Sequence, residues 1–179
     1  MSSASFSVRS ATPADSPAIG EVNVAAWNAI YRGTLADATL DGLDPAGKAA
    51  EWRTYIASEM SPLERMWVVL DDSEDVVGYS RTGPVRDKDL DPEYTAEVYG
   101  LYVHPDHWST GAGRELFAWV VEDFIDRAFS EASLWVVEVN ARARSFYERN
   151  GWRLDPGPTN TCFGAPEVRY RKRLSRARR

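Results

Sequence analysis

The sequence predicts a single α/β or α+β domain in which helices pack on a mixed sheet, and three observations support this. The hydrophobic pattern after Tyr99 reads strand, helix, strand, helix and strand, an order typical of helices that cover a sheet. Residues 65–105 hold three strand-like runs in succession, which favours a meander. A chain of 179 residues with 44% hydrophobic residues, including 7 Trp, 8 Tyr and 6 Phe, can bury a sizeable core.

The first third of the chain is expected to form one strand and two helices. Residues 6–11 alternate in polarity like an edge strand. Thr12 and Pro13 give the N-cap and first-turn signals of a helix, and Asp15 completes the pattern of a capping box. A second helix is predicted over residues 45–58.

The rest of the chain is expected to alternate strands and helices. The predicted strands cover residues 65–72, 76–83, 95–105 and 133–139. The first two form a hairpin through the acidic turn DDSED. A long helix follows the glycines near residue 112, and a brief helix over residues 140–151 has Asn140 as N-cap and Gly151 as stop signal. The Pro- and Gly-rich residues 155–167 predict a loop before the last strand.

Charge is divided unevenly along the chain. Residues 169–179 hold seven of the 21 basic residues and no acidic one, whereas residues 1–168 carry fourteen basic and 27 acidic residues, a net charge of −13. We therefore expect one domain over residues 1–168 and a last strand that runs into a basic, frayed tail over residues 169–179. The acidic body argues against a nucleic-acid partner, because such binding relies on many basic side chains, and it suits a positively charged substrate.

The sequence also predicts the cellular compartment of the protein. No apolar run approaches the roughly 20 residues that cross a bilayer, and the N-terminal residues lack the pattern of a secretory signal, so a cytoplasmic protein without a membrane partner is expected. Cys162 is the single cysteine and cannot form an internal disulfide. With only His104 and His107 as histidines, no metal-ligand set is convincing and no metal is expected.

Gly111 and Gly113 lie where a strand passes into a helix. Glycines at such a junction can adopt backbone conformations closed to other residues. The first turn of a helix offers unpaired N–H groups and a partial positive charge, which together suit an anion. The alternative interpretation is that both glycines merely turn the chain. A P-loop is excluded because its Lys-Ser/Thr pair is missing, and a dinucleotide fingerprint is excluded because GAGREL lacks the third glycine.

Two segments together resemble the GCN5-related N-acetyltransferase (GNAT) superfamily, whose members bind acetyl-coenzyme A (acetyl-CoA). LYVHPDHWSTGAG is similar to a Val-x-Pro strand end followed by a Gln/Arg-x-x-Gly-x-Gly/Ala loop, and NARARSFYERNGWR to Asn-x-x-Ala-x-x-Phe-Tyr-x-x-x-Gly-Phe. The residues in register are Val103, Pro105, Gly111, Gly113, Asn140, Ala143, Phe146, Tyr147 and Gly151. Trp152 replaces the usual Phe, and Trp108 occupies the Gln/Arg position. The resemblance extends over nearly the whole chain.

The resemblance implies a fold and a cofactor site. The implied fold is a mixed, mostly antiparallel central sheet of about six or seven strands with a splay between the two central strands, flanked by about four helices. Acetyl-CoA would lie along the splayed strand as acyl donor. The implied cofactor-binding residues are Leu101, Tyr102, Val103, Trp108, Ser109, Thr110, Gly111, Ala112, Gly113, Arg114, Asn140 and Tyr147.

The catalytic residues implied by the resemblance are few. A backbone N–H near Leu101 would polarise the acetyl carbonyl, and Tyr147 holds the general-acid position, from which it would protonate the leaving thiolate. An acceptor amine must lose a proton before it can attack, and Glu97, on the cofactor strand, is the predicted base, acting directly or through water. The alternative for Glu97 is an exposed strand acid.

The acceptor is the least specified part of the prediction. Trp27, Tyr31 and Tyr99 are expected to shape its pocket, unless they are aromatic residues of the core. The predicted function is acetyl transfer from acetyl-CoA to a primary amine of a small, cationic molecule. Two alternatives stay open: acetylation of a protein or peptide amine, and a CoA-binding regulatory domain without turnover, which the Trp108 substitution favours. The resemblance also favours a homodimer.

Overall fold

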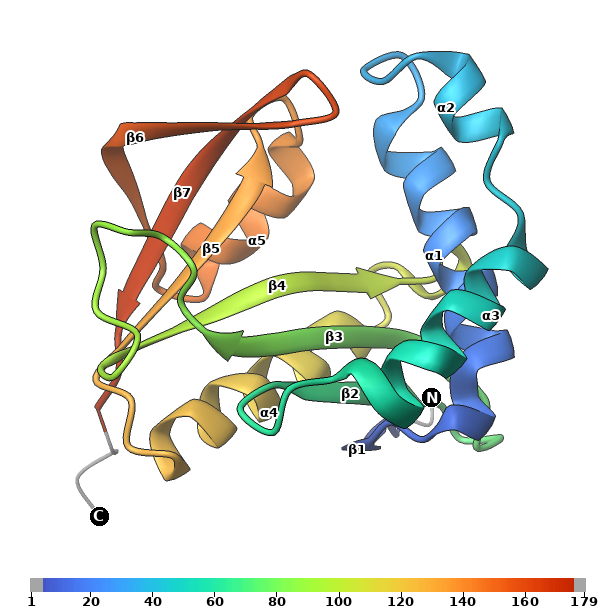
Figure 1. The fold of residues 1–179 in the computed structure, drawn as a ribbon, viewed down its shortest axis with the longest axis horizontal. Coiled ribbons are helices and arrows are strands. Elements are labelled where there is room, and N and C mark those ends of the chain that lie inside the picture. Colours follow the sequence, from blue (N-terminus) through green and yellow to red (C-terminus); the bar gives the residue numbers. More distant parts are fainter. Residues whose placement is uncertain (1–4, 176–179) are drawn as a thin grey trace. The chain divides into compact units, whose positions relative to one another are not determined.

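The computed structural model describes residues 5–175, and the strands in this part form one seven-stranded sheet (Figure 1). Hydrogen-bonded neighbours give the strand order β1-β2-β3-β4-β5-β7-β6. The strands are β1 Ser7–Ser10, β2 Arg65–Leu70, β3 Val76–Pro84, β4 Thr95–Val103, β5 Glu131–Val137, β6 Arg153–Cys162 and β7 Ala165–Arg173. The α-helices are α1 Ser16–Tyr31, α2 Asp37–Asp41, α3 Pro45–Thr54, α4 Ala112–Asp126 and α5 Ala141–Arg149. The sheet is open and mostly antiparallel, and the predicted fold class is confirmed.

The described residues fall into two compact units. The first contains residues 5–81 and 100–120, and the second contains residues 82–99 and 121–175. β3, β4 and α4 contribute residues to both units. No helix within residues 5–175 is long and apolar enough to cross a membrane.

The first unit packs α1 and α3 side by side, as Figure 1 shows. The predicted capping box is confirmed: Asp15 accepts hydrogen bonds from the backbone N–H and the hydroxyl of Thr12 at 2.7 and 3.0 Å. The two helices approach closely at Gly20, where an added Cβ would lie 2.5 Å from the carbonyl oxygen of Pro45. The core of this unit consists of Ile19, Val22, Met66, Val68, Leu70 and Tyr79.

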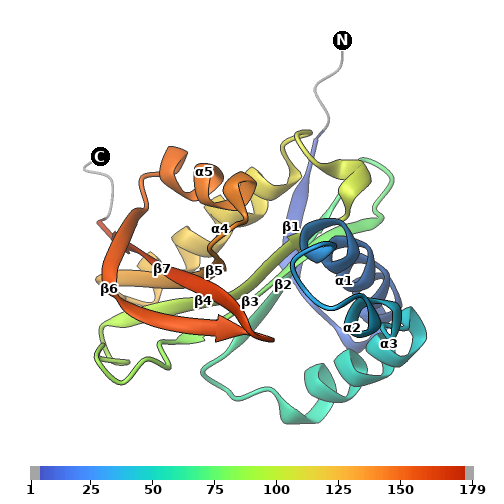
Figure 2. The ribbon, with the colours of Figure 1, turned by 90° about the horizontal axis from the view of Figure 1, so that it is seen from above.

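The second unit contains the parallel pair of the sheet. β4 and β5 pair in parallel over Thr95–Val98 and Glu131–Leu134, whereas β4 continues to Val103 and β5 to Val137. This short ladder is the pattern that a splay between two central strands produces. β5 also pairs along its whole length with β7, which is antiparallel to it, and β6 forms the edge (Figure 2).

Three elements differ from the sequence-based expectations. The Pro- and Gly-rich segment predicted as a loop forms most of β6, which pairs with β7 but shifts register between Asp155 and Asn160. An edge strand with such an irregularity can hold prolines, because their missing N–H groups face no partner strand. The helix predicted over residues 45–58 is α-helical only to Thr54 and continues as a π-helical turn, Tyr55–Glu59. The five-residue helix α2 was not predicted.

Candidate functional site

The loop between β4 and α4 adopts the backbone conformations that the glycine pattern predicts, but only in part. Gly111 has φ +112° and Ser109 has φ +64°, so two residues of the loop lie in the left-handed region. Gly113 lies inside α4 and does not, and a Cβ added to it would be 3.6 Å from Cγ2 of Val103, an ordinary contact. The prediction of a special conformation is therefore confirmed for Gly111 and wrong for Gly113, because the helix begins before it.

Side chains within this loop hold it to the end of β4. The indole N–H of Trp108 donates to the carbonyl oxygen of Val103 at 2.8 Å. The Thr110 hydroxyl donates to the carbonyl oxygen of His107 at 2.7 Å. Two side chains of the predicted cofactor-binding set, those of Trp108 and Thr110, therefore brace the loop from inside.

The N-terminal end of α4 has the groups that an anion requires. Its helical hydrogen bonds begin with the N–H of Glu115, which donates to the carbonyl oxygen of Gly111 at 3.0 Å. The amides of residues 112–114 precede that bond, and amides in this position carry the partial positive charge of a helix start. Ala112 is buried and Arg114 is exposed. Because Gly111 turns the chain without a side chain, the loop fits a pyrophosphate group such as that of coenzyme A.

In the first unit, Trp27 and Tyr31, the aromatic residues predicted to shape the acceptor pocket, lie near Tyr102 of β4. The ring centroids of Trp27 and Tyr31 are 5.1 Å apart, and that of Tyr102 lies 6.4 Å from Trp27. Tyr31 is buried and Trp27 is partly exposed. Leu101 and Tyr102 are both partly exposed, whereas Val103 is buried. Tyr31 is therefore a core residue in this unit, while Trp27 keeps accessible surface.

Tyr147 lies on α5 in the second unit, where it is 8% exposed. Its ring centroid is 5.7 Å from that of Phe146, 6.4 Å from Trp152 and 6.1 Å from Tyr170. Asn140 is the N-cap of α5, as predicted, and its side-chain oxygen accepts from the N–H of Ala143 at 3.1 Å. The cap and the aromatic contacts fix the start of α5 and the position of the Tyr147 ring.

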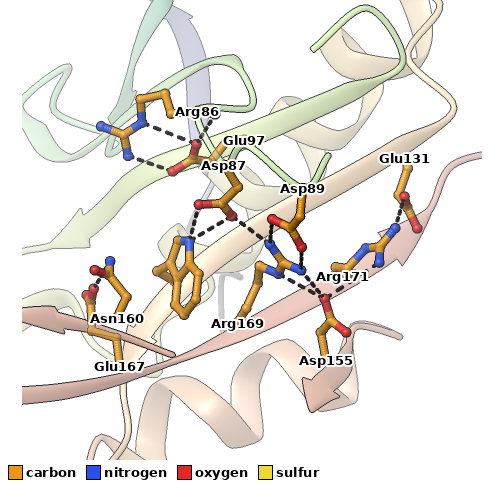
Figure 3. A network of polar contacts seen from close by, with 11 residues as sticks. Arg86, Asp87, Asp89, Glu97, Glu131, Asp155, Asn160, Glu167, Arg169 and Arg171 are labelled. Carbon is orange, nitrogen blue, oxygen red and sulfur yellow. Dashed lines mark hydrogen bonds and ion pairs between the residues drawn. The ribbon is translucent and has the colours of Figure 1, made fainter. Parts of the chain in front are cut away.

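Glu97 is 2% exposed and bound to one arginine, Arg86 (Figure 3). One carboxylate oxygen accepts from the Arg86 guanidinium at 2.6 Å, and the other accepts from the Arg86 backbone N–H at 2.9 Å and from its Nε at 3.2 Å. The Arg86 guanidinium also lies 4.0 Å from the ring centroid of Tyr99, whose hydroxyl donates to the carbonyl oxygen of Pro84 at 2.7 Å. The alternative of an exposed strand acid is thus wrong for Glu97.

Glu97 and Tyr147 belong to opposite faces of the sheet in the second unit. Residues paired in a ladder point to the same face, and successive residues alternate. Glu97 pairs with Ser133, which places it on the face of Trp135 and Arg169. Tyr170, one residue after Arg169, points to the other face, and the ring of Tyr147 packs against it. The two predicted catalytic groups therefore approach the sheet from different sides.

Three charged residues near Glu97 were not among the predicted site residues. Arg86 binds Glu97. Arg169, expected where the last strand runs into a basic tail, is 2% exposed and bound to three aspartates. Glu167 is partly buried and accepts from the Asn160 amide at 2.8 Å. Burial raises the pKa of Glu167 above its ordinary value of 4.5. Side chains alternate along a strand, so residues 167, 169 and 171 lie on one face of the last strand. This alternation was the sequence pattern from which Arg169 and Glu167 could have been predicted to lie together. The last basic residues, 176–179, lie outside the described part.

Comparisons with known proteins identify a family model and relatives that match this chain. The model of the "Acetyltransferase (GNAT) family" matches residues 27–152. "Uncharacterized N-acetyltransferase YuaI" of Bacillus subtilis is 28% identical over 133 residues, which are 74% of this chain and 72% of that protein. "Probable N-acetyltransferase Rv2775" of Mycobacterium tuberculosis is 26% identical over 178 residues, 96% of this chain and 95% of that protein.

Solved structures share the fold at lower sequence identity. The PaiA N-acetyltransferase of Thermoplasma acidophilum in complex with coenzyme A superimposes with a TM-score of 0.76 at 17% identity, covering 95% of this chain and 99% of that one. The ribosomal-protein-S18-alanine N-acetyltransferase of Escherichia coli has a TM-score of 0.66 at 18% identity, covering 97% and 96%. These similarities extend over nearly the whole of each chain.

Proposed function

Because the chain belongs to the acetyltransferase (GNAT) family, we propose that it transfers the acetyl group of acetyl-CoA to a primary amine of a small, cationic molecule. The family makes it an N-acetyltransferase that uses acetyl-CoA. The observation that carries the proposal is the braced loop before α4, in which Gly111 has φ +112° at the start of a 15-residue helix. That loop suits the pyrophosphate of coenzyme A.

The residues that would hold acetyl-CoA come from three segments. The backbone of β4 would pair with the extended arm of the cofactor, and the amides of the α4 loop would bind its pyrophosphate. The proposed set is Leu101, Tyr102, Val103, Trp108, Ser109, Thr110, Gly111, Ala112, Gly113, Arg114, Asn140 and Tyr147. When bound, acetyl-CoA supplies a thioester whose carbonyl carbon is open to attack. The proposed role of the Leu101 amide is to stabilise the oxyanion that forms there.

The proposed chemistry forms a C–N bond and an S–H bond and breaks a C–S bond and an N–H bond. The nitrogen of a neutral amine attacks the carbonyl carbon, the C–S bond breaks, and the sulfur leaves with the bonding electrons. Tyr147 would donate its phenolic proton to that sulfur, and Glu97, directly or through water, would take the proton that the amine loses.

One partly buried carboxylate, that of Glu167, supports a cationic acceptor. Arg86 and Glu97 balance each other in charge, and Glu167 takes part in no ion pair within residues 5–175. Glu167 is hydrogen bonded to the neutral amide of Asn160, and burial raises its pKa. The positive charge of Arg86 already acts on Glu167 from a distance, but the two form no ion pair within residues 5–175, so this partly buried carboxylate gains further free energy when a positive ligand approaches. We therefore assign Glu167 to recognition of a positively charged group on the acceptor.

A panel of three amines tests this function. The protein is incubated with acetyl-CoA and 1,4-diaminobutane, n-butylamine or a peptide with an N-terminal alanine, and thiol release and the acetylated product are measured. We expect turnover with 1,4-diaminobutane to exceed that with n-butylamine, because only the former keeps a second ammonium group. Preference for the peptide would favour a protein amine as acceptor. Coenzyme A binding without thiol release from any amine would favour a binding domain without turnover.

We also propose a cytoplasmic homodimer. The single cysteine, Cys162, cannot form a disulfide within the chain, which suits a reducing compartment. Large apolar side chains with at least 44% exposure in the described part include Trp119, Leu154 and Phe163, and a partner could cover some of them. Light scattering over a concentration series tests the dimer, because a monomer has a mass of 20.1 kDa.

A further inference from the structure

Arg169 binds three aspartates from two different segments of the second unit (Figure 3). Its Nη1 and Nη2 atoms contact the two carboxylate oxygens of Asp89 at 2.8 and 2.6 Å, and Nη1 contacts Asp87 at 3.0 Å. Nε donates to Asp155 of β6 at 2.8 Å. A guanidinium offers five N–H donors in a rigid, planar arrangement, and all three nitrogens of the Arg169 guanidinium donate to carboxylates. The three carboxylates allow a side chain that is 2% exposed to stay charged.

The aspartates at positions 87 and 89 belong to the connection between β3 and β4, residues 85–94. Both lie in one turn, which the N–H of Leu90 closes on the carbonyl oxygen of Asp87 at 3.2 Å. The indole N–H of Trp135 also donates to Asp87, at 3.0 Å from one oxygen and 3.2 Å from the other. A connection without regular structure opens at a low free-energy cost when few contacts hold it, because opening gains conformational entropy. Here the turn is held on β5 and β7.

The residue before this turn is Arg86, whose backbone N–H and guanidinium both bind Glu97. Asp87 and Arg86 are adjacent, so a shift of the turn must move the Arg86 amide relative to Glu97. Within residues 5–175, no hydrogen bond or ion pair joins Arg169 to Glu97 directly. The turn is therefore a route by which Arg169 can act on Glu97.

We infer that Arg169 is a positioning residue for acceptor chemistry: by holding Asp87 and Asp89 it sets the place of Arg86, and through Arg86 the place of the Glu97 carboxylate. This inference rests on the proposed role of Glu97 as base. A base that is displaced by a fraction of its hydrogen-bond length loses reactivity without any loss of cofactor binding. The inference therefore predicts damage to the acceptor step alone.

The most direct substitution, Arg169→Lys, removes the fork in a buried position and can prevent folding. Asp89→Asn is the better variant, because the Asp89 side chain is 58% exposed and the change leaves Arg169 with two other carboxylates. Asp89→Glu restores the charge and serves as the rescue. Glu93→Gln is the matched control, since Glu93 is an exposed acid in the same connection.

The experiment has two measurements. Hydrogen exchange of the Arg86 amide reports its bond to Glu97, and steady-state kinetics with 1,4-diaminobutane report the acceptor step. We expect Asp89→Asn to speed that exchange and to lower kcat/KM for the amine roughly 10- to 100-fold, the scale of loss for a displaced group. The KM for acetyl-CoA should stay unchanged. Asp89→Glu should recover most of the loss, and Glu93→Gln should match the original protein in both measurements.

The outcomes separate the inference from the proposed function. Normal exchange and normal kcat/KM in Asp89→Asn, with Glu97→Gln impaired, would overturn the inference and leave the function standing. Equal losses for the amine and for acetyl-CoA would mean that the cluster only supports the fold. If Glu97→Gln itself keeps full turnover, or no amine is acetylated, the proposed role of Glu97 fails. The exchange of the Arg86 amide then decides alone whether Arg169 holds the pair.

Discussion

The indole nitrogen of Trp108 lies 2.8 Å from the carbonyl oxygen of Val103 and donates a hydrogen bond to it. The residue at the position where the family pattern has Gln or Arg thus ties the α4 loop to the end of the cofactor strand. Trp108 brings no positive charge to this position, but its hydrogen bond to Val103 holds the backbone of the loop in place. The substitution that favoured a domain without turnover is consistent with cofactor binding through amides.

Trp108→Phe keeps an aromatic ring and removes the N–H, so it should loosen the loop. A neutral hydrogen bond contributes about 0.5–1.5 kcal/mol, so we expect coenzyme A affinity, measured by calorimetry, to fall by up to about tenfold. Trp119→Phe is the control, because Trp119 is an exposed residue of α4. Equal affinity in Trp108→Phe and the original protein would remove the bond to Val103 from any role in binding.

Gly111 and Gly113 should respond differently to alanine. Gly111→Ala places a side chain at φ +112°, which costs about 1–3 kcal/mol, and should also abolish tight coenzyme A binding by moving the loop. Gly157→Ala is the matched control: its φ is +130° and nothing lies within 4 Å of the added Cβ, so it should lose stability but not affinity. Gly113→Ala should fold normally, since its Cβ makes only an ordinary contact. Calorimetry and urea unfolding separate these effects.

Tyr147→Phe keeps the ring and its contacts with Trp152 and Tyr170 but removes the phenolic proton. If Tyr147 is the general acid, turnover should fall about 10²- to 10⁴-fold while coenzyme A affinity stays nearly constant. Tyr94→Phe is the control, because Tyr94 is 54% exposed. Full turnover by Tyr147→Phe on an accepted amine would show that the thiolate leaves without this donor.

Glu97→Gln keeps the shape of the side chain and removes the base. If Glu97 takes the proton of the amine, activity should be lost near neutral pH and should recover in part at high pH, where more of the amine is neutral. The control is Glu93→Gln, which makes the same charge change on the surface. A pH–rate profile of Glu97→Gln that matches the original would place the base elsewhere.

The part of the fold that depends on local chemistry could be predicted from the sequence. The Thr12–Asp15 capping box and the Asn140 cap rely on neighbours within three residues, and both are confirmed. The strand β6 could not be predicted, because its prolines argue for a loop until an edge position is known. Arg169 was missed because its partners lie up to 82 residues away. The sequence placed Glu97 on a strand, but it could not tell which cation binds it.

Glu167 allows the pH dependence of stability to be used as a test of its burial. Burial raises the folded-state pKa of this acid, so its ionisation disfavours the fold above the unfolded pKa of about 4.5. Glu167→Gln can still accept from the Asn160 amide but cannot ionise. The variant should therefore be more stable than the original in urea at pH 7, and this advantage should vanish below about pH 4, where the carboxyl is protonated in both states. The same variant should lose the preference for 1,4-diaminobutane over n-butylamine. Greater stability with an unchanged preference would confirm the burial and exclude Glu167 from acceptor recognition.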